Sequence, residues 1–167
     1  VIEKREKLLV QTPEAMEARF DIDVRIKNEV LNIDQEEQQV IVKDLEKGEE
    51  YRENYDYLIL SPGADPIQPP LPGLDADNVF TLRDIPDTDQ IKGYIDDKKP
   101  EEAVVVGGGF IGLEMVENLQ ERGISVSLVE MLDQVMSQFD SEMASMIHNH
   151  LRTQGVNLHL NNALEKI

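Results

Sequence analysis

Three glycines that follow a short β-branched run have the spacing in this sequence that points most directly to chemistry. Gly107, Gly109 and Gly112 form the pattern Gly-x-Gly-x-x-Gly directly after Val104–Val106. Between a strand and a helix, this pattern binds the pyrophosphate of a dinucleotide. The first glycine permits a tight turn, the second lets the phosphates approach the backbone, and the third lets the helix pack closely on the sheet. The N-terminus of the helix then presents free N–H groups and a positive dipole end to the phosphates.

A carboxylate at the end of the next apolar run indicates which dinucleotide would bind. Glu130 follows Ser125–Val129, at the separation from the glycines where an acidic side chain accepts hydrogen bonds from the adenosine ribose. The same carboxylate would repel a 2′-phosphate, and no Arg or Lys occurs in the ten residues after it. The pattern therefore favours NADH over NADPH. The alternative is that Glu130 only ends the strand in solvent.

Charge and composition disfavour several classes of function. The 167 residues carry 34 acidic and 16 basic side chains, a formal net charge of -18, which disfavours binding to nucleic acid. They contain no cysteine, which excludes disulfides and cysteine-ligated metal within the chain and fits a cytoplasmic protein. No apolar run approaches the ~20 residues of a membrane span. Because the first residue is Val1 and no signal peptide follows, we expect a piece of a longer polypeptide.

Two histidines near the C-terminus raise the question of a metal site. His148 and His150 are two positions apart, so on a helix their side chains point about 200° apart. They cannot bind one ion together, and no cysteine could complete the site. The sequence therefore predicts no metal centre.

The first half of the chain has the pattern of a short helix followed by a β-meander. Thr12-Pro13 predicts the start of a helix that reaches about Phe20. Three strand-like runs separated by polar turns predict an antiparallel meander: Val24–Ile33, Gln39–Leu45 and Tyr51–Leu60. The apolar end of the third run predicts a strand buried on both faces. Five of the eight prolines then fall in residues 62–73, which predicts an ordered crossing or linker.

The second half alternates helices and strands. The expected elements, in order, are a helix over about Asp87–Asp97, a strand from Ala103, the helix of the glycine pattern to about Arg122, a strand over Ile124–Val129, a helix from Asp140 that ends before Gly155, and a strand over Val156–Leu160. The order β-α-β-α-β predicts a right-handed parallel sheet. Met143, Ile147 and Leu151 would form the core face of the last helix. Residues 163–167 have the pattern of a further strand that begins there.

Two motifs make the sequence similar to a known family. One is the segment 107–114, whose glycines are followed by Glu114, and the other is the segment 55–64, which ends in Ser61-Pro62-Gly63-Ala64. With the proline-rich crossing between them, the chain resembles the FAD-dependent pyridine nucleotide-disulfide oxidoreductases. Within this family it is most similar to the branch of coenzyme A-disulfide reductases and NADH oxidases.

The resemblance implies an α/β fold: a Rossmann-like parallel βαβαβ NAD(P)-binding unit, preceded by a three-stranded antiparallel β-meander from an FAD domain. Residues 1–85 would be the second part of the FAD-binding domain, residues 86–100 a connecting helix and linker, and residues 101–167 a truncated NAD(P)H-binding domain. The family's redox cysteine and its first FAD-binding glycine pattern do not occur in this chain. We therefore expect both upstream, no catalytic residue within the chain, and no activity of the chain by itself.

The resemblance also assigns expected roles to individual residues. Ser61, Pro62 and Gly63 would contact FAD, although many relatives have Thr-Gly where this chain has Pro62-Gly63. Phe110 would gate the nicotinamide, with a place in the core as the alternative, and Glu114 would lie near the nicotinamide and the flavin edge, with a solvated helix position as the alternative. The residues expected to bind NAD are Gly107, Gly108, Gly109, Phe110, Ile111, Gly112, Glu114 and Glu130.

The function that the resemblance implies is hydride transfer from NAD(P)H to FAD. Electrons would then pass to a small-molecule disulfide such as coenzyme A disulfide, or to oxygen or peroxide. The full-length protein is expected to be a cytoplasmic homodimer that binds neither nucleic acid nor membrane. Two alternatives stay open: an NADH reductase of the ferredoxin or rubredoxin type, which has no redox cysteine, and an isolated nucleotide-binding module.

Overall fold

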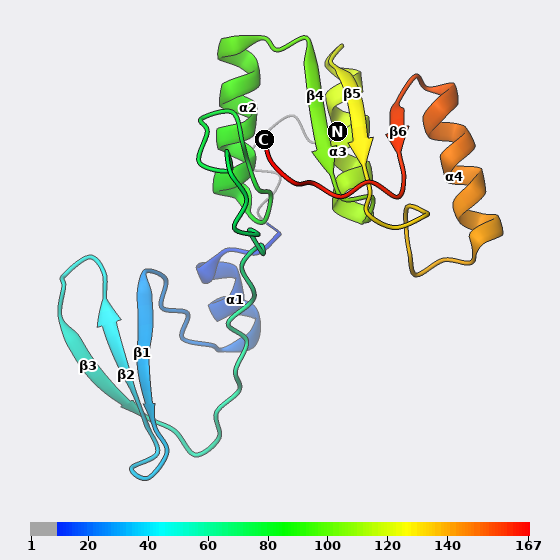
Figure 1. The fold of residues 1–167 in the computed structure, drawn as a ribbon. Helices are drawn as coiled ribbons and strands as arrows, with labels where there is room; N and C mark the ends of the chain where they lie inside the picture. The colour runs from blue at the N-terminus through cyan, green and yellow to red at the C-terminus, as the bar shows by residue number, and fades with distance from the viewer. Residues whose placement is uncertain (1–9) are drawn as a thin grey trace. The chain divides into compact units, whose positions relative to one another are not determined.

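The computed structural model describes residues 10–167, which divide into two compact units between Ala64 and Asp65 (Figure 1). The division falls inside the proline-rich segment 62–73, in line with a role as a connection between units. The domain boundaries expected near residues 85 and 100 stay predictions.

The described part of the first unit, residues 10–64, contains one short helix and an antiparallel meander. Its elements are α1 (Pro13–Phe20), β1 (Asn28–Asp34), β2 (Gln39–Asp44) and β3 (Glu50–Asn54). The Thr12 side chain caps α1 by accepting a hydrogen bond from the N–H of Ala15. The sheet has the order β1-β2-β3, with β2 paired to both neighbours, so the predicted meander is confirmed. β1 begins later than expected, because Lys27 has a φ of 56° and this left-handed conformation interrupts the extended chain.

The prediction of a long third strand buried on both faces was wrong. β3 ends at Asn54, and the apolar side chains that follow are exposed, Tyr57 at 94% and Ile59 at 88%. The cause is the register of the meander, in which Asn54 pairs with Gln39, the first residue of β2. Beyond that pair, β2 gives way to the turn over residues 35–38. No strand within residues 10–167 is therefore paired with residues 55–64.

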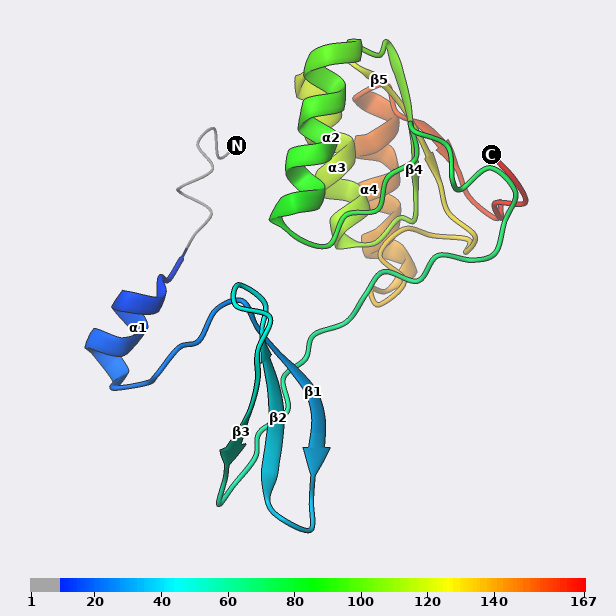
Figure 2. The same cartoon turned by 90° about the vertical axis from the view of Figure 1, so that its left-hand side faces the viewer.

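The second unit is the predicted parallel βαβαβ arrangement, preceded by one helix. Its elements are α2 (Ile85–Lys98), β4 (Glu102–Val106), α3 (Phe110–Glu121), β5 (Ser125–Val129), α4 (Ser141–Thr153) and β6 (Asn157–His159). All strand pairs in the sheet are parallel, in the order β4-β5-β6. Figure 2 shows the three helices of this unit on one face of the sheet. The side chains of Val104 and Val106 on β4 are 65% and 55% exposed.

The core of this unit lies between the sheet and its helices. Val126 and Leu128 of β5 are fully buried and belong to one cluster with Val116 of α3 and Val135. Because β5 is the middle strand, these two side chains have strand neighbours on both sides and lose contact with solvent.

The expected core face of α4 was right at Leu151 and Ile147, which packs partly buried against the core, and wrong at Met143. Leu151 is buried as expected, but Met143 is 55% exposed, and the other buried residues are Ala144 and His148. The spacing of three and four residues fits both stripes equally well. The helix buries Ala144, His148 and Leu151, and His148 accepts a hydrogen bond from the loop that precedes the helix.

The last residues of the chain form no strand, contrary to expectation. In residues 163–167 the contact with another backbone segment is the hydrogen bond from the N–H of Ile167 to the carbonyl of Pro72, at 2.9 Å. Proline has no N–H to donate, so this proline-rich neighbour cannot form a continuous ladder. No helix within residues 10–167 is long and apolar enough to cross a membrane.

Candidate functional site

The glycine pattern forms a tight turn between β4 and α3. Gly107 has a φ of +105°, a conformation that L side chains rarely adopt, and its N–H donates to the carbonyl of Val129 at 2.8 Å. A Cβ on Gly112 would lie 1.9 Å from the carbonyl oxygen of Gly107. The first glycine is thus required for the turn and the third for the close approach of the helix, as the spacing predicted.

The N-terminus of α3 has no side-chain cap, in contrast to α1 and α2; α4 is also uncapped, but its first turn contains Glu142. Thr12 caps α1, and Asp84 caps α2 in a reciprocal capping box with Asp87. At α3 the N-cap is Gly109, no side chain accepts a hydrogen bond from the first turn, and that turn contains no acidic residue. Nothing lies within 4 Å of the position that a Cβ on Gly109 would occupy. This end of the helix therefore fits a bound pyrophosphate, both sterically and electrostatically.

The Glu130 side chain is hydrogen-bonded to the glycine turn, so it is not a solvated residue at the end of the strand. Its Oε2 accepts a hydrogen bond from the N–H of Gly108 at 2.7 Å, and its Oε1 accepts one from the N–H of Leu132 at 2.8 Å. The side chain is half-buried at the carboxyl end of β5. A carboxylate has about four lone-pair sites, so two remain for hydroxyl donors of a ligand.

Phe110 lies at the surface, which rules out the core alternative within the described residues. Its side chain is 62% exposed, and its ring meets that of Phe139 edge-on, with centroids 6.3 Å apart and planes at 86°. Ile111 is 57% exposed and Glu114 is also exposed. The first turn of α3 thus presents two apolar side chains beside the glycine turn. The gating role of Phe110 and the nicotinamide contact of Glu114 stay predictions.

The three residues expected to contact FAD lie in the other unit. Ser61, Pro62 and Gly63 are exposed in the irregular segment after β3, whereas the glycine turn belongs to the second unit. Gly63 has a φ of 77°, so the backbone turns at this point. Their contact with a flavin stays a prediction.

His148 is a buried residue whose structural contact the sequence reasoning missed. It is buried on α4, and its Nε2 accepts a hydrogen bond from the backbone N–H of Val135 at 3.1 Å. Burial lowers the pKa of His148 below its usual value of 6.5, the charge of Arg152 lowers it further, and Asp133 acts in the opposite direction. Its spacing from Ala144 and Leu151 was the available signal, but the histidine was considered only as a metal ligand.

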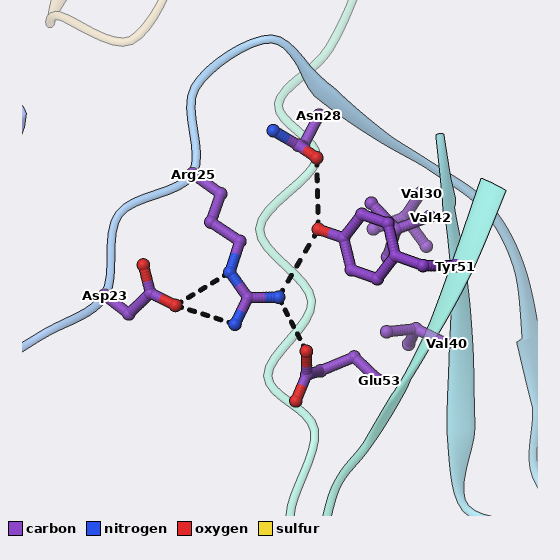
Figure 3. A pocket seen from close by; sticks show the side chains of 8 residues that line it. All are labelled: Asp23, Arg25, Asn28, Val30, Val40, Val42, Tyr51 and Glu53. Atoms are coloured by element: carbon purple, nitrogen blue, oxygen red, sulfur yellow. Dashed lines mark hydrogen bonds and ion pairs between the residues drawn. The ribbon is translucent and has the colours of Figure 1, made fainter. Parts of the chain in front are cut away.

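A pocket on the meander does not fit an anionic ligand. Figure 3 shows the guanidinium group of Arg25 between Asp23 and Glu53, beside the ring of Tyr51. Arg25 donates to Glu53 at 2.6 Å and to Asp23 at 2.7 Å, and the hydrogen bond to Glu53 is the main cause that raises its pKa. Because two carboxylates already neutralise this cation, the pocket offers no free charge to a phosphate.

The chain is similar to curated oxidoreductases over almost its whole length. An NADH oxidase from Methanocaldococcus jannaschii is 37% identical over 167 residues, which cover 99% of this chain. A coenzyme A disulfide reductase from Staphylococcus haemolyticus is 35% identical over 167 residues, which cover 100% of this chain. The crystal structure of reduced Bacillus anthracis CoADR-RHD superposes with a TM-score of 0.93 at 53% sequence identity, covering 99% of this chain and 30% of that one.

The match to a protein family covers almost the whole sequence. Residues 2–167 match the pyridine nucleotide-disulphide oxidoreductases. The chain spans 37% of the length of each of the two curated relatives. Because the family match covers residues 2–167, the chain belongs to the pyridine nucleotide-disulphide oxidoreductase family, as the two motifs of the sequence predicted.

Proposed function

We propose that this chain is the NADH-binding part of a flavoprotein oxidoreductase that passes hydride from NADH to FAD. The observation that supports this most strongly is the N-terminus of α3, which has no side-chain cap. It adjoins a glycine turn in which the N–H of Gly108 donates a hydrogen bond to Glu130. The relatives named NADH oxidase and coenzyme A disulfide reductase support the same class of reaction.

The residues of the second unit can bind each polar part of NADH. The backbone N–H groups at the start of α3 would receive the pyrophosphate. The remaining lone pairs of Glu130 would accept hydrogen bonds from the adenosine ribose, and its charge would repel a 2′-phosphate. Phe110 would cover the nicotinamide and shield it from water, while Glu114 would lie near its carboxamide.

The flavin would be held in part by the first unit. Ser61, Pro62 and Gly63 are exposed at a turn, where backbone groups are accessible to a ligand. When bound, FAD would supply the hydride-accepting chemistry, which the side chains of this chain do not provide. The chain's own residues bind and orient the two nucleotides.

The terminal electron acceptor would be a small molecule. The name of the coenzyme A disulfide reductase supports a disulfide such as coenzyme A disulfide, and we propose oxygen or peroxide as the other acceptors. Because the 167 residues contain no cysteine, thiol–disulfide exchange would use a cysteine from another part of the polypeptide, and the chain alone would be inactive. We further propose a cytoplasmic homodimer that binds neither nucleic acid nor membrane, for which the net charge of -18 is the supporting observation on nucleic acid.

A second candidate is supported by similarity to a solved ferredoxin reductase from Rhodopseudomonas palustris, with 25% sequence identity and a TM-score of 0.81 over 93% of this chain and 37% of that one. A reductase of the ferredoxin or rubredoxin type shares the two nucleotide sites and passes electrons to a protein without a thiol. An isolated nucleotide-binding module is a third possibility, which would bind NADH without flavin chemistry. Assays with coenzyme A disulfide, oxygen and a one-electron acceptor protein separate these activities.

Calorimetric titration of the full-length protein with NADH tests the nucleotide site. We expect saturable binding that Glu130→Arg weakens at least tenfold, since the change removes both acceptors and the bond to Gly108. Glu117 is an exposed carboxylate on α3 outside the site, so Glu117→Arg provides a control with the same change of charge. Equal losses in the two variants would mean that the carboxylate acts only through net charge, and absence of binding to the unmodified protein would refute the proposal.

A further inference from the structure

The loop between β5 and α4 contacts the glycine turn through backbone and side chain. We call this segment, residues 131–139, the clamp loop. Figure 1 shows that it connects the end of β5 to the start of α4. The N–H of Met136 donates to the carbonyl of Gly108 at 2.8 Å. A Cβ on Gly108 would lie 2.8 Å from Cγ1 of Val135, so the loop leaves room only for glycine. Gly108 is thus held on its carbonyl side by Met136 and on its N–H side by Glu130.

The clamp loop has a conformation that it would not adopt without support. Met136 has a φ of 51°, in the left-handed region that is unfavourable for a residue with a long side chain. Such a conformation persists only where the surrounding contacts determine it. Val135 is fully buried and Met136 is 3% exposed, so the centre of the loop is packed within the protein. The loop therefore depends on specific interactions at residues 135 and 136.

His148 supplies the polar interaction at this point. Its imidazole lies on the buried face of α4, and Nε2 accepts the hydrogen bond from the N–H of Val135 at 3.1 Å. Without this acceptor, the N–H of Val135 would be buried with no partner. A continuous path thus runs from His148 through Val135 and Met136 to Gly108.

We propose that His148 is a positioning residue for the nucleotide site, which it stabilises by fixing the clamp loop and, through it, the Gly108 peptide. The inference rests on the proposed binding of NADH at the glycine turn. His148 does not itself contact the nucleotide in this arrangement. Its contribution is to hold Gly108 in the conformation that leaves the N-terminus of α3 open to the pyrophosphate.

The arrangement requires a neutral imidazole. A ring that accepts at Nε2 carries its proton on Nδ1, whereas a doubly protonated ring would turn a second N–H toward the N–H of Val135. Burial favours the neutral form of the ring, and the positive charge of Arg152 on α4 does so as well. Asp133 on the clamp loop is the opposing charge. At neutral pH the hydrogen bond is therefore intact, and acid disrupts it.

Two substitutions at His148 and one control in the full-length protein test the inference. His148→Leu fills a similar volume without an acceptor, His148→Gln keeps an acceptor that cannot be protonated, and His150→Leu changes an exposed histidine of the same helix. Hydrogen exchange of the backbone amides of Gly108, Val135 and Met136 is measured without nucleotide, and the Kd for NADH is measured by titration. A Kd increase of up to about tenfold is expected for His148→Leu, because NADH binding must then restore the clamp-loop conformation that the unpaired N–H destabilises.

The expected results differ from those of a merely structural role. His148→Leu should accelerate exchange at the three amides and weaken NADH binding, His148→Gln should recover much of both, and His150→Leu should change neither. Faster exchange with an unchanged Kd would overturn the inference, as would unchanged exchange. If the unmodified protein fails to bind NADH, the proposed function falls, whereas binding that is insensitive to His148 overturns this inference alone.

The pH profile keeps the test decisive if His148→Leu does not fold. The Kd for ADP-ribose, an acid-stable part of the dinucleotide, is compared for the unmodified protein and His148→Gln between neutral pH and about one unit below the usual histidine pKa. Only the unmodified protein should lose affinity on acidification. Parallel pH profiles for the two proteins would overturn the inference.

Discussion

The N–H of Gly108 donates a hydrogen bond to the carboxylate of Glu130 at 2.7 Å, so the residue that follows β5 is bonded to the turn that follows β4. This bond joins the two sequence features from which a dinucleotide site was inferred. It also gives Glu130 a structural task, because the carboxylate orders the loop, beside the ribose contact proposed for it. The arrangement places the negative charge of Glu130 beside the glycine turn.

The full-length enzyme should prefer NADH to NADPH. The Glu130 carboxylate is fixed by two N–H donors and cannot turn away from a 2′-phosphate, and no cation occurs in the ten residues that follow. We expect kcat/KM for NADH to exceed that for NADPH by at least tenfold, and Glu130→Arg should reduce this ratio. Steady-state kinetics with both nucleotides measure it, and a ratio of one or below would show that Glu130 does not select the nucleotide.

Phe110→Ala should change hydride-transfer kinetics with little effect on stability. Because the ring is 62% exposed, its removal should cost less than about 1 kcal/mol of unfolding free energy, compared with roughly 3–5 kcal/mol for a buried phenylalanine. Stopped-flow kinetics and thermal unfolding provide the two measurements. Met146→Ala is a control, since Met146 is 66% exposed on α4. A large loss of stability with unchanged kinetics would place Phe110 in a buried interface instead.

Gly112→Ala should destabilise the second unit and weaken NADH binding. The new Cβ would lie 1.9 Å from the carbonyl oxygen of Gly107, so the helix or the turn must move. Overpacking of this kind costs about 1–3 kcal/mol. Gly93→Ala is the matched control, because Gly93 lies within α2 and nothing lies within 4 Å of its Cβ position. There the change should increase stability by roughly 0.5–1 kcal/mol, as measured by urea unfolding.

Stability of the second unit should fall on acidification as His148 becomes protonated. Burial lowers its pKa in the folded state below the usual 6.5, so the unfolded state binds the proton more tightly. The contribution is fully present above pH 6.5 and is lost as pH falls through the lowered folded-state pKa. Urea unfolding across this range should show a decline in the unmodified protein that is smaller in His148→Gln. Equal declines in both proteins would assign the effect to other groups.

The parallel unit could be predicted from the sequence because local signals agreed there. Apolar runs, glycine ends and the fingerprint spacing all indicated the same order of strands and helices, and Glu130 was identified by its position alone. The segment 55–64 was predicted wrongly for a physical reason. An apolar run such as Tyr57–Leu60 indicates burial, but it becomes a strand only where another backbone supplies hydrogen bonds, and β2 does not extend that far.

The role of His148 could not be read from the sequence because it depends on a tertiary contact. The pattern on α4 allowed two overlapping stripes, one through Met143 and one through Ala144, and both end at Leu151. The buried His148 accepts a hydrogen bond from the N–H of Val135, a backbone group in a loop whose conformation no periodicity describes. Backbone partners of this kind have no signature in residue types.

Anaerobic mixing of the full-length protein with NADH, followed through the visible flavin band, tests the central claim most directly. The account predicts that bound FAD is reduced rapidly by NADH, and that Gly112→Ala and Glu130→Arg each slow this reduction at a fixed nucleotide concentration while Glu117→Arg does not. A full-length protein that holds no flavin, or whose flavin NADH does not reduce, would contradict it.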